Sequence, residues 1–283
     1  MKKGLSIVIP AYNEEKSIGS VIEEIERVMS RSEIPFEIII VNDASRDNTK
    51  DVIRKYKVKV IEHQFNRGYG ASLKSGLNNA LYDYVAITDA DTTYPNEKIP
   101  ELYQYIDSFQ MVVGARTGEE VHIPFFRKPA KWFLNKLANF LTNTKIPDLN
   151  SGLRIFHKDL VKSYFHILPS GFSFTCTITL ALLCDDYDVK YIPINYKKRV
   201  GKSKIKSRDA FDFLLLIIRT IIYFNPLKVF LPLSFIFGVF TVLALCYDVI
   251  VGQGIFNKSV IFFIFTMFIF IFGLLADLIV RKR

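Results

Sequence analysis

The chain has 283 residues, of which 37 are Lys or Arg and 28 are Asp or Glu, so its formal net charge is +9. Half of the residues are hydrophobic, and this composition excludes an intrinsically disordered or collagen-like chain. Apolar runs alternate with charged residues up to about Tyr187, whereas the chain from Leu227 onward is nearly uncharged. The sequence therefore predicts a soluble domain followed by a membrane segment.

The cysteines and histidines form no recognisable metal-ligand pattern. The three cysteines, at positions 176, 184 and 246, include no Cys-x-x-Cys pair, and the four histidines show no ligand spacing. Neither a disulfide framework nor a zinc site is expected. The first apolar run ends at Pro10 and is too short for a secretion signal, so we expect the N-terminal domain to stay on the cytoplasmic side.

Strand-like and helical patterns alternate along the first 116 residues. The run at 5–12 is strand-like, and residues 15–29 carry apolar side chains at helical spacing. Further strands are expected at 36–43, 58–63, 84–91 and 111–116, with helices after the second strand to about 56, after the third to about 80, and from about 96. This alternation predicts an α/β fold with a mostly parallel sheet and helices on both faces.

Polar side chains follow four of these strands, where ligands of such sheets bind. Taken singly, each also fits a structural role, such as capping of the next helix by Asp43. Together they predict a functional site at one edge of the sheet. The residues are Tyr12, Asn13 and Glu14, then Asn42 and Asp43, then Asp89 and Asp91, and finally Arg116.

Asp89 and Asp91 are separated by one residue at the end of a buried strand. Carboxylates of this kind suit Mg²⁺ or Mn²⁺ bridged to a diphosphate, and the ion would neutralise charge on a nucleotide leaving group. Gly68 and Gly70 belong to an incomplete dinucleotide-binding pattern at the third strand rather than the first, so NAD binding is not favoured.

Two apolar segments near the C-terminus have the length of membrane-crossing helices. Residues 229–247 and 259–276 contain no charge, and the second helix is expected to continue to about 279. Cations lie before the first helix and after the second, so the positive-inside rule puts both flanks, and thus both termini, in the cytoplasm. The predicted protein is an integral membrane protein with two passes.

The segment between the soluble domain and the hairpin is apolar but interrupted by Asp212 and Arg219. We interpret residues 210–224 as an amphipathic helix on the inner leaflet, with a buried core helix as the alternative. The run 197–208 before it has seven cations and no acid, and such a run attracts anionic lipids.

Six motifs occur in order along the chain: PAYNEE (10–15), VNDASRDNT (41–49), NRGYGASLKSG (66–76), TDADTTYP (88–95), DLNSGLR (148–154) and RVGKSK (199–204). Together they resemble family 2 glycosyltransferases with a GT-A fold. More narrowly, they resemble the polyprenyl-phosphate hexose synthases, the group that includes dolichyl-phosphate mannose synthase. The resemblance implies a GT-A domain at 1–205, a juxtamembrane amphipathic helix at 206–226 and a transmembrane hairpin at 227–283.

The resemblance assigns roles to individual residues. For the metal, it implies that Asp91 is the main ligand and Asp89 lies near it, while Thr93 stands where many relatives have a ligating Gln. Asp148, Asp91 and Arg116 are the expected catalytic residues. The residues implied in nucleotide-sugar binding are Pro10, Tyr12, Glu14, Asp43 and Asp89, and those implied in binding the acceptor phosphate or the donor diphosphate are Arg127, Arg199, Ser203 and Lys204.

The implied reaction is a single inverting displacement. A hexose would pass from a UDP- or GDP-hexose to a dolichyl or undecaprenyl phosphate, with Mg²⁺ or Mn²⁺ as cofactor. A lipid phosphate is already an anion, so it needs little from a general base, and Asp148 is expected to position groups rather than to accept a proton.

Two alternatives remain open at this stage. One is transfer to a hydroxyl of a glycan or lipid-linked oligosaccharide, which would need a base such as Asp148. The other is an inactive, membrane-anchored scaffold that binds a nucleotide-sugar. A nucleic-acid partner is not expected, because the basic residues concentrate beside the membrane segment and match no recognition motif.

Overall fold

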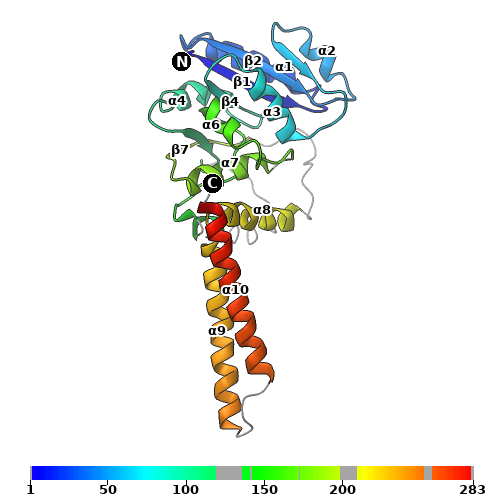
Figure 1. Ribbon diagram of the computed structural model, residues 1–283. Helices are drawn as coiled ribbons and strands as arrows, with labels where there is room; N and C mark the ends of the chain where they lie inside the picture. Colours follow the sequence, from blue (N-terminus) through cyan, green and yellow to red (C-terminus); the bar gives the residue numbers. More distant parts are fainter. Residues whose placement is uncertain are drawn as a thin grey trace. The chain divides into compact units, whose positions relative to one another are not determined.

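The computed structural model of the chain (Figure 1) describes residues 2–118, 136–140, 142–171, 173–197, 209–251 and 257–281. The chain divides into two compact units, Met1–Phe213 and Leu214–Arg283. The first unit holds the sheet and the second holds the two long C-terminal helices. The bounds of the three segments expected from the sequence stay a prediction.

The first unit is built on a seven-stranded sheet with the order β3-β2-β1-β4-β6-β5-β7. All neighbouring pairs are parallel except those of β6, which runs antiparallel to both β4 and β5. The predicted mostly parallel α/β sheet is therefore confirmed. The strands are β1 (Leu5–Ala11), β2 (Phe36–Asn42), β3 (Lys59–Glu62), β4 (Tyr84–Ile87), β5 (Met111–Ala115), β6 (Arg154–His157) and β7 (Val189–Pro193).

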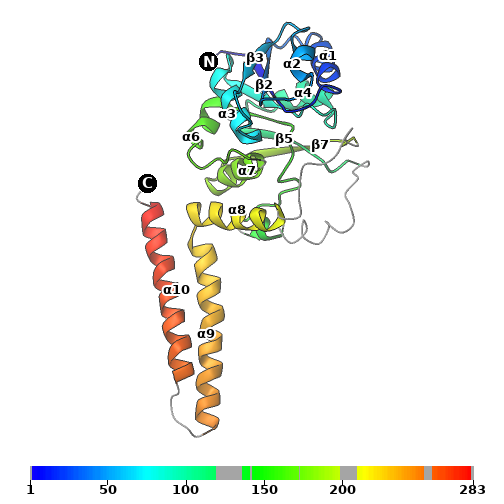
Figure 2. The same cartoon turned by 90° about the vertical axis from the view of Figure 1, so that its right-hand side faces the viewer.

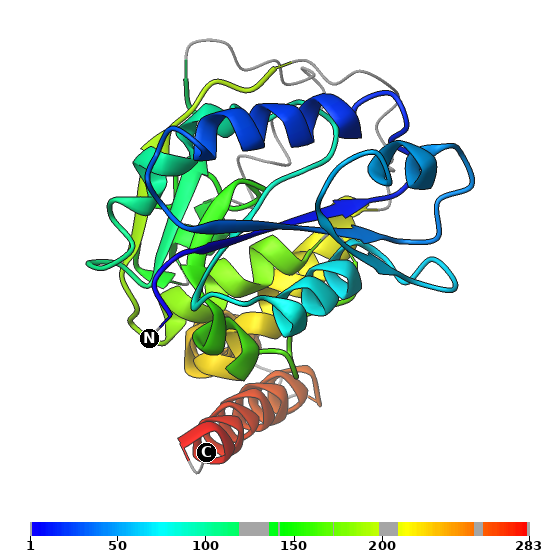
Figure 3. The ribbon, with the colours of Figure 1, turned by 90° about the horizontal axis from the view of Figure 1, so that it is seen from above.

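Helices cover both faces of this sheet. Seen from above, α1 lies on one side of the strands and α3 and α7 lie on the other (Figure 3). The helices of the first unit are α1 (Ile18–Met29), α2 (Thr49–Ile53), α3 (Tyr69–Asn79), the short 3-10 helix η1 (Asn96–Lys98), α4 (Ile99–Tyr103), α6 (Lys158–Ser163) and α7 (Phe174–Cys184); α8 (Asp209–Phe224) begins at its end.

Strand β1 lies at the centre of the core, and its alternate side chains face opposite layers. Ile7 and Ile9 belong to the same buried cluster as Ile22 and Ile25 of α1, whose apolar residues share one face of the helix. On the other face, Gly76 of α3 lies so close to Val8 that a Cβ atom at position 76 would meet that side chain. This close approach brings α3 against the centre of the sheet.

The predicted elements differ from the observed ones mainly at their ends. The helix expected from residue 15 begins at Ile18, because residues 12–17 form a loop, and the helix expected to reach about 56 ends at Ile53. The strand expected at 84–91 ends at Ile87, before the two aspartates. β6, β7, α6 and α7 had no counterpart among the predicted elements.

The second unit contains α9 (Leu227–Ile250) and α10 (Asn257–Arg281), which lie side by side (Figure 1, Figure 2). Both are long and apolar enough to cross a bilayer, and only 11% of each apolar window is buried. A core helix such as α7, in which ten of eleven residues are buried, shows the opposite pattern. The length and exposure of the two helices agree with the predicted membrane hairpin.

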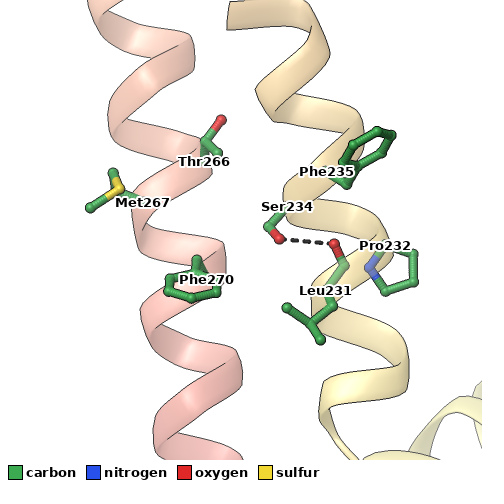
Figure 4. A pocket seen from close by; sticks show the side chains of 7 residues that line it. All are labelled: Leu231, Pro232, Ser234, Phe235, Thr266, Met267 and Phe270. Atoms are coloured by element: carbon green, nitrogen blue, oxygen red, sulfur yellow. Dashed lines mark hydrogen bonds between the residues drawn. The ribbon is translucent and has the colours of Figure 1, made fainter.

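The two hairpin helices pack through aromatic and small side chains. Phe237 stacks on Phe265 with a centroid distance of 6.3 Å, and a Cβ atom added to Gly273 would lie 2.6 Å from Phe230. Leu231 of α9 and Phe270 of α10 are among the residues that line an apolar groove of about 500 Å³ (Figure 4). The carbonyl oxygen of Leu231 accepts a hydrogen bond from the Ser234 hydroxyl.

Candidate active site

A polar pocket of about 450 Å³ lies where β1, β2 and β3 end. Tyr12 lines it from the end of β1, Asn42 and Arg46 from the end of β2 and the loop after it, and His63 and Phe65 from the loop after β3. Because the carboxyl ends of parallel strands share one edge of the sheet, three loops distant in sequence meet here. Phe65 is 68% exposed, which is unusual for an aromatic side chain.

The first two of these loops are joined by side-chain hydrogen bonds. Asn13, with a φ of 55°, accepts a hydrogen bond from the backbone N–H of Arg46 at 2.7 Å. The backbone N–H of Glu14 donates to Thr49 at 2.8 Å, and the Glu14 carboxylate accepts from Ser17 at 3.1 Å. Pro10 lies in β1 beyond the part paired with β4, whose register ends at Val8. These bonds fix the loop that carries Tyr12.

Asp43 lies directly after β2 and is 4% exposed. Its Oδ1 accepts the backbone N–H of Arg67 at 2.8 Å, and its Oδ2 accepts the backbone N–H of Gly68 at 2.8 Å. The ring of His63 lies with Nδ1 2.7 Å from Oδ1. Asp43 therefore holds the loop after β3 as well as lying at the predicted nucleotide site.

Asp89 and Asp91 follow β4, and each is oriented by a hydroxyl group. The Tyr69 hydroxyl donates to Oδ1 of Asp89 at 3.0 Å. Burial, together with the neighbouring Asp89 charge, raises the pKa of Tyr69 well above its ordinary value, so its hydroxyl stays protonated and can donate. Thr93 donates to Oδ1 of Asp91 through its hydroxyl at 2.5 Å and its backbone N–H at 3.2 Å. In the structure, Thr93 thus supports Asp91.

The carboxylates after β4 have space beside them. A Cβ atom on Gly152 would lie 3.0 Å from both carboxylate oxygens of Asp89, so the glycine leaves room that any side chain would fill. Two carboxylates are hard oxygen donors of the kind that Mg²⁺ and Mn²⁺ prefer. Within the described part of the chain, no three His, Cys, Asp or Glu residues gather as a metal site. An ion held by Asp89 and Asp91 would therefore complete its shell with oxygens of a ligand or water.

Asp148 and Arg116 form a buried ion pair at the end of β5. Oδ2 of Asp148 accepts Nε of Arg116 at 2.7 Å and its backbone N–H at 3.0 Å, while Oδ1 accepts Nη2 at 2.9 Å. The Asp148 side chain is 3% exposed. The guanidinium also lies over the Tyr196 ring, 5.1 Å from its centroid. Both oxygens of the carboxylate are thus engaged by one cation.

Three residues that sequence reasoning did not single out complete the site. Tyr94 accepts the backbone N–H of Gly152 through its hydroxyl oxygen at 2.6 Å, and Tyr196 packs edge-on against Tyr94. The third is Arg154, which is fully buried and holds the loop that carries Asp148. Tyr94 and Arg154 lie in motifs quoted above, TDADTTYP and DLNSGLR, whereas no motif contains Tyr196.

The structure brings the predicted residues of the strand ends to one edge of the sheet. Four predicted phosphate-binding residues lie outside the described residues, and their roles stay predictions. They are Arg127, Arg199, Ser203 and Lys204.

The sheet topology and the paired aspartates after β4 agree with the nucleotide-sugar glycosyltransferases of GT-A fold that the motifs resemble, and comparison with known proteins gives the family. Residues 6–165 match the family described as Glycosyl transferase family 2, and residues 225–281 match the GtrB C-terminal hairpin. The chain belongs to glycosyl transferase family 2.

Curated relatives cover much of the chain. A dolichyl-phosphate hexose transferase of Haloferax volcanii is 30% identical over 71% of this chain and 86% of its own length. A dolichol-phosphate mannosyltransferase of Pyrococcus furiosus is 28% identical over 74% of this chain and 61% of its own length. Other relatives, such as a dodecaprenyl-phosphate galacturonate synthase of Rhizobium johnstonii, are matched over only 49% of their length.

Solved structures share the fold at low sequence identity. Glucosyl-3-phosphoglycerate synthase of Mycobacterium tuberculosis, solved with Mn²⁺, UDP and glucosyl-3-phosphoglycerate, has a TM-score of 0.62 and 18% identity over 77% of this chain and 80% of its own. Mannosyl-3-phosphoglycerate synthase of Rubrobacter xylanophilus has a TM-score of 0.60 and 18% identity over 77% and 72%. These likenesses confirm the predicted GT-A fold.

Proposed function

We propose that the chain is a membrane-bound inverting glycosyltransferase that moves a hexose from a UDP- or GDP-hexose to a polyprenyl phosphate. Support comes from the names of the Haloferax and Pyrococcus relatives, which act on dolichyl phosphates. The match of residues 225–281 to a membrane hairpin adds to it, because a lipid acceptor is met at the membrane surface.

The donor nucleotide fits the polar pocket at the ends of β1, β2 and β3. Tyr12 lines the pocket and offers a ring for stacking on the base. Asp43 lies between the pocket-lining residues Asn42 and Ala44, and it would offer a carboxylate for a base N–H group. Pro10 in β1, Glu14 in the loop after β1 and Asp89 after β4 are assigned to the same proposed nucleotide-sugar site. The bases of UDP and GDP both carry an N–H group that can donate a hydrogen bond to a carboxylate. Asp43 therefore does not distinguish uracil from guanine.

Asp89 and Asp91 would hold Mg²⁺ or Mn²⁺, which when bound neutralises the charge that develops on the leaving nucleoside diphosphate. Solved proteins that share this fold contain Mn²⁺ with UDP, in support of the assignment. Tyr69 and Thr93 orient the two carboxylates through the hydrogen bonds described above.

The Arg116–Asp148 ion pair is the observation that carries this choice of acceptor. Transfer to a hydroxyl requires a base that takes a proton, and a carboxylate held by a guanidinium at both oxygens is poorly suited to that task. A phosphate monoester is already ionised at neutral pH and attacks without losing a proton. Asp148 instead fixes Arg116, whose charge can stabilise the phosphates of donor or acceptor.

The acceptor would approach from the cytoplasmic face of the membrane. The positive-inside rule supports a cytoplasmic catalytic domain with both termini on the same side. Arg127, Arg199, Ser203 and Lys204 are the proposed contacts for the acceptor phosphate or the donor diphosphate, and the basic run 197–208 would draw an anionic headgroup to the site.

Transfer of labelled sugar tests the proposal. The full chain in detergent is incubated with labelled UDP-glucose, UDP-N-acetylglucosamine or GDP-mannose, a polyprenyl phosphate and Mg²⁺ or Mn²⁺, with Asp91→Ala as the control. A labelled lipid that is cleaved by mild acid and is missing in the variant is the expected result. Normal nucleotide binding without a lipid product, or label on a glycan hydroxyl, would contradict the proposed acceptor.

A further inference from the structure

Asp43, His63 and Ser75 form a hydrogen-bonded row that joins two strand ends to a helix. His63 follows β3, and its Nδ1 lies 2.7 Å from Oδ1 of Asp43, while its Nε2 lies 2.8 Å from the hydroxyl oxygen of Ser75 in α3. The side chains of His63 and Asp43 are each only 5% exposed. No pattern in the sequence distinguishes this histidine from the other three.

The chemistry of the row fixes the roles of its members. The Asp43 carboxylate can only accept, so Nδ1 of His63 carries the proton that lies between them. In the neutral ring, Nε2 is then an acceptor, and the Ser75 hydroxyl donates to it. Ser75 thereby favours the one tautomer that can donate to Asp43.

Most hydrogen-bond acceptor positions of the Asp43 carboxylate are occupied by donors of the protein. An ionised carboxylate has about four acceptor positions. Three of those of Asp43 are taken, by the His63 ring and by the backbone N–H groups of Arg67 and Gly68. Within the described part of the chain, one acceptor position of Asp43 has no protein donor, and the three bonds together orient the carboxylate. Without His63, Oδ1 would lose its side-chain donor, and only the two backbone N–H groups would hold the carboxylate.

The same loop leads to the metal aspartates. Gly68, with a φ of +94°, precedes α3, and a side chain there would meet the carbonyl oxygen of Ser170. The next residue, Tyr69, donates its hydroxyl to Asp89. Asp43 therefore anchors the backbone immediately before the residue that orients Asp89.

We propose that His63, oriented by Ser75, is a positioning residue for the donor nucleotide: it holds Asp43 so that the remaining acceptor position of the carboxylate receives an N–H group of the base. The inference rests on the proposed function, since it takes the ligand to be UDP or GDP. It adds two residues, one of which lines the nucleotide pocket and neither of which has a role in the resemblance described above.

Equilibrium binding of UDP and of GDP, each with Mn²⁺, tests the inference on the full chain in detergent without any lipid acceptor. The variants are His63→Phe, which fills the space but cannot donate, His63→Gln, whose amide can donate to Asp43, and Ser75→Ala. His166→Phe is the matched control, because His166 is an exposed histidine in another part of the unit. Thermal unfolding of each variant reports whether it is folded.

For the nucleotide that the wild-type chain binds, we expect His63→Phe to raise Kd about tenfold, the effect of losing one charge-assisted hydrogen bond. His63→Gln should recover most of this loss, and Ser75→Ala should raise Kd about threefold. With saturating donor, kcat of the folded variants should stay within about twofold of wild type, because positioning acts on binding. The control should bind like wild type.

An unchanged Kd in His63→Phe, or a fall in kcat with no change in KM for the donor, would overturn the inference. If His63→Phe does not fold, Ser75→Ala is the deciding variant, because it removes only one hydroxyl from a half-buried helix position. A wild-type Kd for the nucleotide in Ser75→Ala would then overturn the inference. Absence of a lipid product with normal nucleotide binding counts only against the proposed acceptor. A wild-type chain that binds neither UDP nor GDP would overturn both proposals.

Discussion

Arg116 and Asp148 face each other in a two-point ion pair, with Nε 2.7 Å from Oδ2 and Nη2 2.9 Å from Oδ1. The two residues are far apart in sequence, and the pair joins the end of β5 to the loop before β6. The guanidinium plane is fixed a second time by the Tyr196 ring beneath it. A cation held this firmly is preorganised to stabilise negative charge.

Asp148→Asn should lower kcat about 100-fold, because an amide cannot engage Arg116 at two points and its NH₂ group would face another donor. The dependence of kcat on pH between about 6 and 9 should keep its wild-type shape, since Asp148 is not expected to accept a proton. Steady-state kinetics of labelled sugar transfer measures both quantities. Asp159→Asn, at an exposed acid of α6, is the control. Recovery of activity with rising pH would falsify this role.

Thr93→Val should lower the apparent affinity of the enzyme for Mn²⁺ and leave the rate of the chemical step nearly unchanged. The Thr93 hydroxyl donates to Oδ1 of Asp91 at 2.5 Å, and loss of such a supporting bond typically costs 10-fold or more in metal affinity, so half-saturation with Mn²⁺ should need about tenfold more ion. At saturating Mn²⁺, kcat should approach the wild-type value. Thr93→Ser should behave like wild type, as should Thr144→Val at an exposed site. Equal Mn²⁺ dependence in Thr93→Val would contradict the prediction.

Gly152→Ala should impair transfer even though it adds one methyl group. The added Cβ would lie 3.0 Å from both oxygens of Asp89 and 3.1 Å from the Tyr94 ring, so Asp89 must move or the loop must shift. We expect activity at limiting Mn²⁺ to fall about tenfold. Gly171→Ala is a matched control, because a Cβ at position 171 would meet nothing within 4 Å. The prediction fails if the two variants have the same Mn²⁺ titration curve.

The sequence predicted the elements that carry a strong local pattern and missed those that depend on distant partners. β1 and β2 are continuous apolar runs, and their observed ends lie one residue from the expected ones. β6 has only four residues and begins with Arg154, a side chain that pattern analysis does not place in a core. α7 is apolar on all sides, so it has no helical period to detect.

The candidate site shows the same division. Asp43, Asp89, Asp91 and Arg116 could be found because each follows a strand of a parallel sheet. The sequence could not show that Asp148 would be held by Arg116. Nor could it show that one histidine, His63, is buried against Asp43, because both pairings arise only when separate loops meet in the fold.

Arg154 provides a stability prediction, because its charge is fully buried. Nε and Nη2 donate to the carbonyl oxygen of Ser151, while Nη1 donates to the carbonyl oxygen of Thr175 at 2.9 Å and to the hydroxyl of Thr179 at 2.8 Å. Among the described residues, no carboxylate forms an ion pair with it. Burial lowers the pKa of Arg154, while the nearby Asp148 charge and the hydrogen bonds to Ser151, Thr175 and Thr179 favour the charged form.

Arg154→Met should therefore lower the free energy of unfolding by about 3 kcal/mol, since two buried carbonyl groups lose their donors. Arg154→Lys should also destabilise, because a single ammonium group lacks the fork that reaches Ser151 and Thr175 together. Denaturant unfolding of the full chain in detergent, followed by circular dichroism, measures both effects. Arg54→Met, at an exposed arginine of a surface ion pair, should change stability by less than about 0.5 kcal/mol. Equal free energies of unfolding for Arg154→Met and wild type would contradict this prediction. The cost of burying the charge would then equal the gain from its hydrogen bonds, and the role of Arg154 would be to orient the loop that carries Asp148.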